Sequence, residues 1–131
     1  MSKPRFFKTQ AEWRKWLEKN HQTATEQVIG FHKAASGRKG ITRKEALDEA
    51  LCFGWIDGVT GSLGDHAWHM RYSPRQKRSI WSDINIRRME ELKAERKVAP
   101  AGLAAYERRD PKLQKRYSFE NRHVVLDVAY E

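Results

Sequence analysis

The sequence predicts an α+β fold: a small, mainly antiparallel sheet with a central hairpin at about residues 55–72, packed with three or four helices. Two observations lead to this prediction. Segments with apolar residues at helical spacing are interleaved with short segments that alternate between apolar and polar residues. A glycine-containing turn at residues 60–65 separates two of the alternating segments, which is typical of a β-hairpin. The length of 131 residues fits a single domain, spanning 1–131.

Two capping boxes mark the starts of the first two predicted helices. Thr9 is followed three residues later by Glu12, and Thr42 is followed in the same way by Glu45. The first helix ends near His21, and its inward face is formed by Trp13, Trp16 and Leu17. The second ends at Gly54, and its apolar stripe consists of Ala46, Leu47, Ala50 and Leu51. Between these helices, residues 26–33 alternate as a strand does.

The two arms of the predicted hairpin are residues 55–59 and 67–72. Because successive side chains of a strand point to opposite faces, one face of the first arm carries Trp55, Asp57 and Val59. We expect this face also to carry Arg71 from the second arm.

Serine and proline residues mark the starts of the last two predicted helices. Ser79 or Ser82 can cap a helix that runs to about Lys97. Its inward side chains are Met89 and Leu92. Pro100 suits the first turn of the final helix. Residues 112–131 are basic and then rich in β-branched residues, and they form an extended C-terminal segment whose position the pattern does not predict.

Charge favours an anionic partner. The formal net charge is +9, and residues 71–88 hold six Lys or Arg side chains against Asp83 alone. Cys52 is the only cysteine, so an intrachain disulfide is excluded, and it reads as a small buried hydrophobe. Because the sequence lacks a secretory leader pattern and a long apolar run, we expect a cytoplasmic protein.

The strongest candidate site is an anion-binding pocket between the second hairpin arm and the helix that follows. Arginine and lysine side chains supply charge there, while serine and asparagine donors gather near a helix N-terminus, where free amides favour anions. Trp81 would shield one side from water, and Asp57 would position an arginine. The predicted ligand-binding residues are Trp55, Asp57, Arg71, Arg75, Lys77, Ser79, Trp81, Ser82 and Asn85. The ligand would be a phosphorylated or carboxylated small molecule, or an anionic group on a partner.

Asp57 has a structural interpretation beside the functional one. A buried carboxylate is costly unless it is paired. An ion pair with Arg71 or with Arg75 would therefore fix the loop, and it could also orient a ligand-binding arginine. A plain basic turn, with Ser79 or Ser82 acting only as a helix cap, is the corresponding alternative for the whole segment.

Two other functional classes stay open. Aromatic side chains interleaved with Arg and Lys are typical of single-strand nucleic-acid surfaces, although residues at these spacings are more often core. These side chains are Trp55, Trp68, Tyr72 and Trp81. A small enzyme acting on an anionic substrate would use Asp57, but the pattern identifies no catalytic set and implies no cofactor. Asp65, His66 and His69 do not have the spacing of a metal site.

Four motifs occur along the chain: Leu51–Gly58, Pro74-Arg75 with Lys77–Ser79, Trp81-Ser82 to Asn85, and Pro100–Leu103. In these motifs the chain resembles the YdeI/OmpD-associated family, which is also labelled bacteriocin-protection proteins. The resemblance implies a role in tolerance to bacteriocins or cationic peptides. It also implies a basic, helical C-terminal module, which would begin at about the last residue, Glu131. A net charge of +9 argues against direct sequestration of a cationic peptide.

Overall fold

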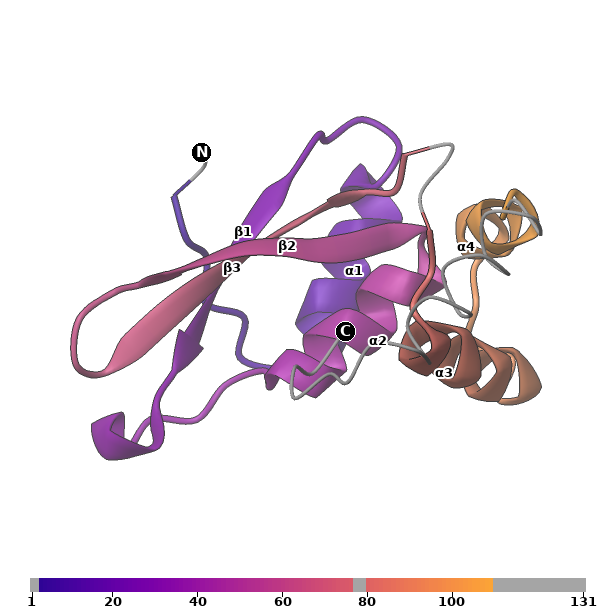
Figure 1. Ribbon diagram of the computed structural model, residues 1–131. Coiled ribbons are helices and arrows are strands. Elements are labelled where there is room, and N and C mark those ends of the chain that lie inside the picture. The colour runs from indigo at the N-terminus through magenta and orange to yellow at the C-terminus, as the bar shows by residue number, and fades with distance from the viewer. Residues whose placement is uncertain (1–2, 77–79, 110–131) are drawn as a thin grey trace.

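The computed structural model describes residues 3–76 and 80–109 and confirms the α+β fold class (Figure 1). The helices are α1 (Gln10–Asn20), α2 (Arg43–Cys52), α3 (Asp83–Ala94) and α4 (Pro100–Glu107). The strands are β1 (Gln27–His32), β2 (Trp55–Ser62) and β3 (Ala67–Pro74). A short 3-10 helix, η1 (Ala34–Ser36), lies in the connection between β1 and α2 and was not indicated by the sequence pattern. Residues 112–131 lie outside the described residues.

The sheet is antiparallel, with the strand order β1-β3-β2, so β3 is central. Asp57 of β2 lies opposite Tyr72 of β3, and Phe31 of β1 lies opposite Trp68. Outside β1, Arg5 forms an isolated parallel bridge with Ile29. The N-terminal segment therefore shields part of the outer edge of β1, which would otherwise present open hydrogen-bonding groups.

Helices α1 and α2 lie against one face of the sheet (Figure 1). Tyr72 points toward these helices, and Asp57, which lies opposite it, points to the same face. The ring centre of Tyr72 lies 5.7 Å from that of Trp13 on α1, and both aromatic side chains are fully buried. Large aromatic side chains give this small domain a sufficient apolar core from few positions.

An irregularity in the hairpin changes the predicted face of one residue. The β2–β3 register shifts between Asp57 and Thr60. Such a bulge adds a residue to one strand and interrupts the alternation of side chains. Val59 is therefore 60% exposed, whereas Trp55 is buried. The prediction from a period of two, which placed both side chains on one face, is wrong for Val59.

Helix α4 packs against the C-terminal end of α2 through a glycine. The backbone N–H of Ala99, just before α4, donates to the carbonyl oxygen of Cys52 at 2.9 Å. Gly102 lies so close to the same carbonyl group that a Cβ atom would overlap it. This close approach requires the absence of a side chain at position 102.

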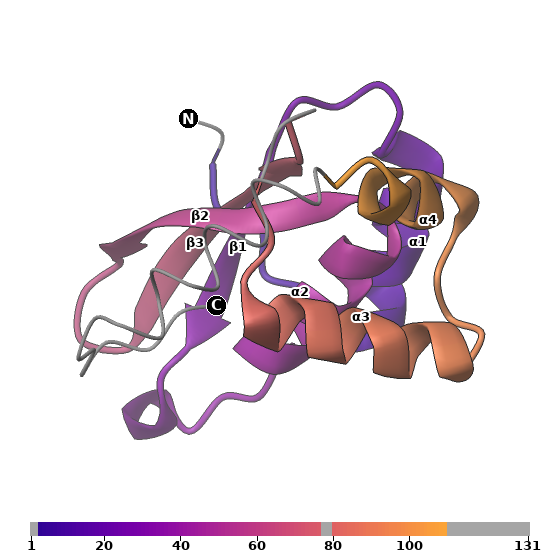
Figure 2. The same ribbon diagram turned by 45° about the vertical axis from the view of Figure 1, so that its right-hand side comes forward.

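The connection between β1 and α2 lies at the end of the molecule away from α3 and α4, as both ribbon views show (Figures 1 and 2). Among the described residues, no helix combines the length and the apolar character needed to cross a membrane.

Candidate anion-binding site

Only part of the predicted pocket is brought together: Arg75 lies over Trp81 and near Asp57, whereas Arg71 points to the other face of the sheet. Trp55, Trp81 and Asn85 are each only 1% exposed. Trp81 packs edge-on against Tyr106, with ring centres 5.1 Å apart, so its indole belongs to the core and is not a shield over a ligand. The hydroxyl oxygen of Ser82 accepts from the backbone N–H of Asn85 at 3.1 Å, which makes Ser82 the cap of α3.

Lys77 and Ser79 lie outside the described residues. For Ser82, the alternative prediction of a helix cap is confirmed by its hydrogen bond with Asn85.

Arg75 lies in the interior instead of on a rim, and Asp57 is half-buried. Arg75 is 8% exposed, and its guanidinium carbon lies 3.8 Å from the ring centre of Trp81. Burial lowers the pKa of Arg75 to about 10, and the nearby Asp57 opposes that change. Burial also raises the pKa of Asp57, while Arg43 and Arg75 act in the opposite direction. The charges of Asp57 and Arg75 therefore act on each other, and the ion pair between them stays a prediction.

The alternative pair, Asp57 with Arg71, is wrong. Asp57 lies opposite Tyr72, so Arg71, the neighbour of Tyr72 in the strand, points to the other face of the sheet. There its Nε donates to a carboxylate oxygen of Glu26 at 2.6 Å. Arg71 therefore cannot share a pocket with Asp57.

Two more polar groups are buried in the core, one on β3 and one in the first turn of α3. The hydroxyl of Tyr72 and the Oδ1 of Asn85 have no hydrogen-bond partner among the described residues. Burial raises the pKa of Tyr72, and the charge of Asp57 adds to this effect. Buried polar groups of this kind are costly, so they mark a region whose hydrogen bonding the described residues do not complete.

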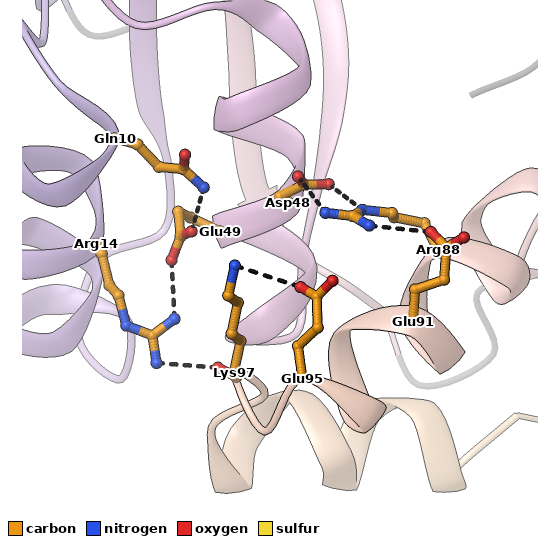
Figure 3. Close-up of polar contacts among 8 residues, drawn as sticks. All are labelled: Gln10, Arg14, Asp48, Glu49, Arg88, Glu91, Glu95 and Lys97. Atoms are coloured by element: carbon orange, nitrogen blue, oxygen red, sulfur yellow. Dashed lines mark hydrogen bonds and ion pairs between the residues drawn. The ribbon is translucent and has the colours of Figure 1, made fainter.

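Two buried carboxylates on α2 are further candidates, and the sequence pattern did not indicate them. Asp48 and Glu49 are 7% and 4% exposed. Nε and Nη2 of Arg88 on α3 each donate to Asp48 at 2.8 Å (Figure 3). Glu49 accepts from Nε2 of Gln10 at 2.5 Å and from Nη1 of Arg14 at 2.8 Å (Figure 3). Because both carboxylates are matched in this way, they join α2 to its neighbouring helices and are not poised for chemistry.

A basic hollow lies between the end of the sheet and the connection that leads into α2. We call it the basic pocket, and its volume is about 420 Å³. Its charged or aromatic lining residues are Phe31, His32, Arg38, Lys39, Arg43 and Trp68. None of its described lining residues is acidic.

A second hollow of about 480 Å³, which we call the adjacent hollow, shares His32 and Arg38 with the basic pocket. Phe6 and His66 also line it, and again no acidic residue does so among those described. By contrast, a third hollow, of about 460 Å³ beside α1, contains Glu12 as well as cations. Of these three hollows, the two around Arg38 have the described lining that most favours an anion.

The charges around the basic pocket follow from a run of cations in the sequence. Between His32 and Glu45 there are five Lys or Arg residues and no acidic residue. Arg38 and Lys39 are exposed, and no carboxylate of the described residues forms an ion pair with either. Thr42 caps α2 beside them, so the positive end of the helix dipole adds to the same potential. This run was the available sequence signal, but the predicted site was placed some thirty residues later.

The site contains no evident metal-binding set. Within the described part of the chain, no three His, Cys, Asp or Glu side chains gather in a way that could hold a metal ion.

Residues 5–105 match the sequence family described as Domain of unknown function (DUF8412). The chain belongs to this family. Comparisons with curated proteins and with solved structures gave no significant match. The family description assigns no ligand and no activity, so a function for this DUF8412 protein has to be argued from the geometry of its own residues.

Proposed function

We propose that this protein binds a phosphate-bearing ligand in the basic pocket, with Arg38, Lys39 and Arg43 as the phosphate-binding side chains. The observation that supports this proposal is the pocket of about 420 Å³ that contains these three cations and no acidic residue among its described lining. Arginine suits phosphate because its planar guanidinium can donate two parallel hydrogen bonds to two oxygens.

The electrostatics of the chain favour the same class of ligand. A net charge of +9 attracts anions over a distance, and cations gathered in a hollow increase their local concentration. Arg38 and Lys39 are exposed, so they can bind phosphate without first leaving a buried position. Arg75, by contrast, is buried against Trp81 and would have to leave the core.

The test is a titration with inorganic pyrophosphate, followed by isothermal calorimetry and by the amide NMR signals of residues 33–43. Replacing Arg38 and Lys39 together by alanine should lower the affinity at least about tenfold, because each charged hydrogen bond contributes about 1.5–3 kcal/mol. The matched control replaces Arg87 and Arg108 by alanine, which removes the same charge from exposed positions on α3 and at the end of α4.

Equal losses in the two double variants would show that only net charge matters, and the basic pocket would be rejected. Shifts of amide signals in α3, with none in residues 33–43, would reject it as well.

We also propose a relationship with the YdeI/OmpD-associated family, supported by the motifs at Leu51–Gly58 and Pro100–Leu103. A role in bacteriocin tolerance would then act through an anionic ligand and not through capture of a cationic peptide, because like charges repel. Cells that produce the Arg38→Ala/Lys39→Ala variant should lose any tolerance that the wild-type protein gives. Retained tolerance would separate that role from the basic pocket.

A further inference from the structure

Two aromatic stacks flank the cations of the basic pocket. Phe31 and Trp68 stack with ring centres 4.6 Å apart and an interplanar angle of 25°. Phe6 and His32 stack with ring centres 4.7 Å apart and an angle of 22°. The first pair lines the basic pocket, and the second pair lines the adjacent hollow.

The sheet register places the two stacks on opposite faces of one end of the sheet. Phe31 lies opposite Trp68, and the next residue, His32, lies opposite Ala67. Because neighbouring residues of a strand point to opposite faces, the two stacks lie on the two sides of the same end of the sheet. Arg38 lines both hollows, so its side chain lies where the two sides meet.

The rings are accessible in part and are held by close packing. Phe6 is 41% exposed, and Trp68 is half-buried. The Phe6 ring lies directly over Gly30, where a side chain would displace it. Phe6 and Trp68 therefore each present a partly exposed aromatic surface at a fixed position.

We infer that the ligand is single-stranded nucleic acid, bound with one base on Trp68, the next on the Phe6–His32 stack, and the intervening phosphate on Arg38. It rests on the proposed phosphate binding and identifies the bound phosphate as part of a nucleic-acid backbone. Single-strand sites combine cations along the backbone with aromatic side chains on which successive bases stack. The alternation of aromatic stack, cation and aromatic stack matches the alternation of base, phosphate and base in a strand.

The test measures binding of a fluorescein-labelled oligothymidylate of about eight nucleotides by anisotropy, beside AMP and pyrophosphate by calorimetry. The full chain is used throughout. Trp68→Leu should lower the affinity for the oligonucleotide and for AMP about tenfold. Phe6→Leu should lower the affinity for the oligonucleotide alone, because it removes the second stacking position. Neither change should alter the affinity for pyrophosphate, since both leave the cations in place.

Salt dependence provides a second measurement. If the strand contacts Arg38, Lys39 and Arg43, the logarithm of its association constant should fall with the logarithm of salt concentration with a slope of about −2. The Arg38→Ala/Lys39→Ala variant should flatten this slope, and the Arg87→Ala/Arg108→Ala control should leave it unchanged.

The outcomes separate this inference from the proposed function. If pyrophosphate binding depends on Arg38 and Lys39 but Phe6→Leu leaves the oligonucleotide affinity unchanged, single-strand binding is rejected and phosphate binding remains. If AMP binds as tightly as the oligonucleotide, single-strand binding is also rejected, and the ligand is a free nucleotide. If neither pyrophosphate nor the oligonucleotide binds, both proposals fail. Because Phe6 is exposed, Phe6→Leu keeps the test decisive even if Trp68→Leu does not fold.

Discussion

The guanidinium of Arg88 on α3 donates one hydrogen bond to each carboxylate oxygen of Asp48 on α2, both at 2.8 Å. Arg88 also donates to Glu91 on its own helix at 2.9 Å. Asp48 is almost fully buried, so this arginine compensates its charge in the interior. Hydrogen bonds from Arg88 raise its own pKa above the usual value, with Asp48 the largest contributor, so it stays charged at every accessible pH. This pair fixes α3 against α2.

Replacing Arg88 by alanine should lower the free energy of unfolding by about 3 kcal/mol, because it leaves a buried carboxylate without its partner. Urea unfolding followed by circular dichroism measures this change. As a control, Lys97→Ala removes an exposed ion pair with Glu95 and should cost less than about 1 kcal/mol.

Removing both charges at once is the complementary experiment. In the double variant Asp48→Leu/Arg88→Met no buried charge is left without a partner, so most of the lost stability should return. A double variant less stable than Arg88→Ala would mean that the pair is not the source of the loss.

Gly102→Ala should destabilise the protein by more than about 2 kcal/mol, because the new methyl group would overlap the carbonyl group of Cys52. Thermal unfolding gives the comparison. If there were room at this position, the same change would stabilise α4 by up to about 1 kcal/mol through helix propensity. Ala104→Gly, exposed on the same helix, serves as the control and should cost about that amount. A more stable Gly102→Ala variant would contradict the packing of α4 on α2.

Asp57 should make the protein less stable as pH rises from acid to neutral. Its folded-state pKa lies above the ordinary aspartate value because of burial, so the folded protein holds this proton more tightly than the unfolded chain. Its contribution to stability therefore falls as pH rises from the ordinary value through the raised one.

Asp57→Asn should accordingly match the wild type in acid, where Asp57 is protonated, and exceed its stability at neutral pH. Urea unfolding across this pH range checks the difference, and Asp65→Asn in the exposed hairpin turn should show none. A variant that is less stable at neutral pH would mean that the attraction of Arg43 and Arg75 outweighs burial.

Cys52 should not react with thiol reagents in the folded protein. Its side chain is fully buried, and burial raises the pKa of the thiol to about 11, so the reactive thiolate is scarce at pH values near 8. Labelling with a chromogenic disulfide should be complete only in denaturant. A cysteine introduced at the exposed Ser62 should react at once, and rapid double labelling of Ser62→Cys would contradict the burial of Cys52.

Periodicity and capping predicted the secondary structure well because both act over a few neighbouring residues. The capping box of Thr42 and Glu45 forms as the sequence indicates, with hydrogen bonds of 3.2 and 2.9 Å. The face of Arg71 could not be predicted in the same way. It depends on the register of β2 against β3, which a bulge between Asp57 and Thr60 alters.

The buried carboxylates and the basic pocket depend on contacts between distant segments. Asp48 and Glu49 interrupt an otherwise apolar stripe, and their burial is tolerable only because Arg14 and Arg88 reach them from other helices. Lys39 and Trp68 lie far apart in the sequence, and only the folded sheet places both around one hollow. Local patterns contain no information about either arrangement.

The arginine–carboxylate contacts join α2 to α1 and α3, whereas the loop of residues 33–42 lies at the far end of the sheet (Figures 1 and 2). Mutations at well-separated positions usually have additive effects. Under the proposed phosphate binding, substitutions at the exposed loop positions Arg38 and Lys39 would therefore change which molecules the protein recognises while leaving its resistance to denaturation almost unchanged. Relatives with different loops can accordingly differ in specificity and still share one scaffold.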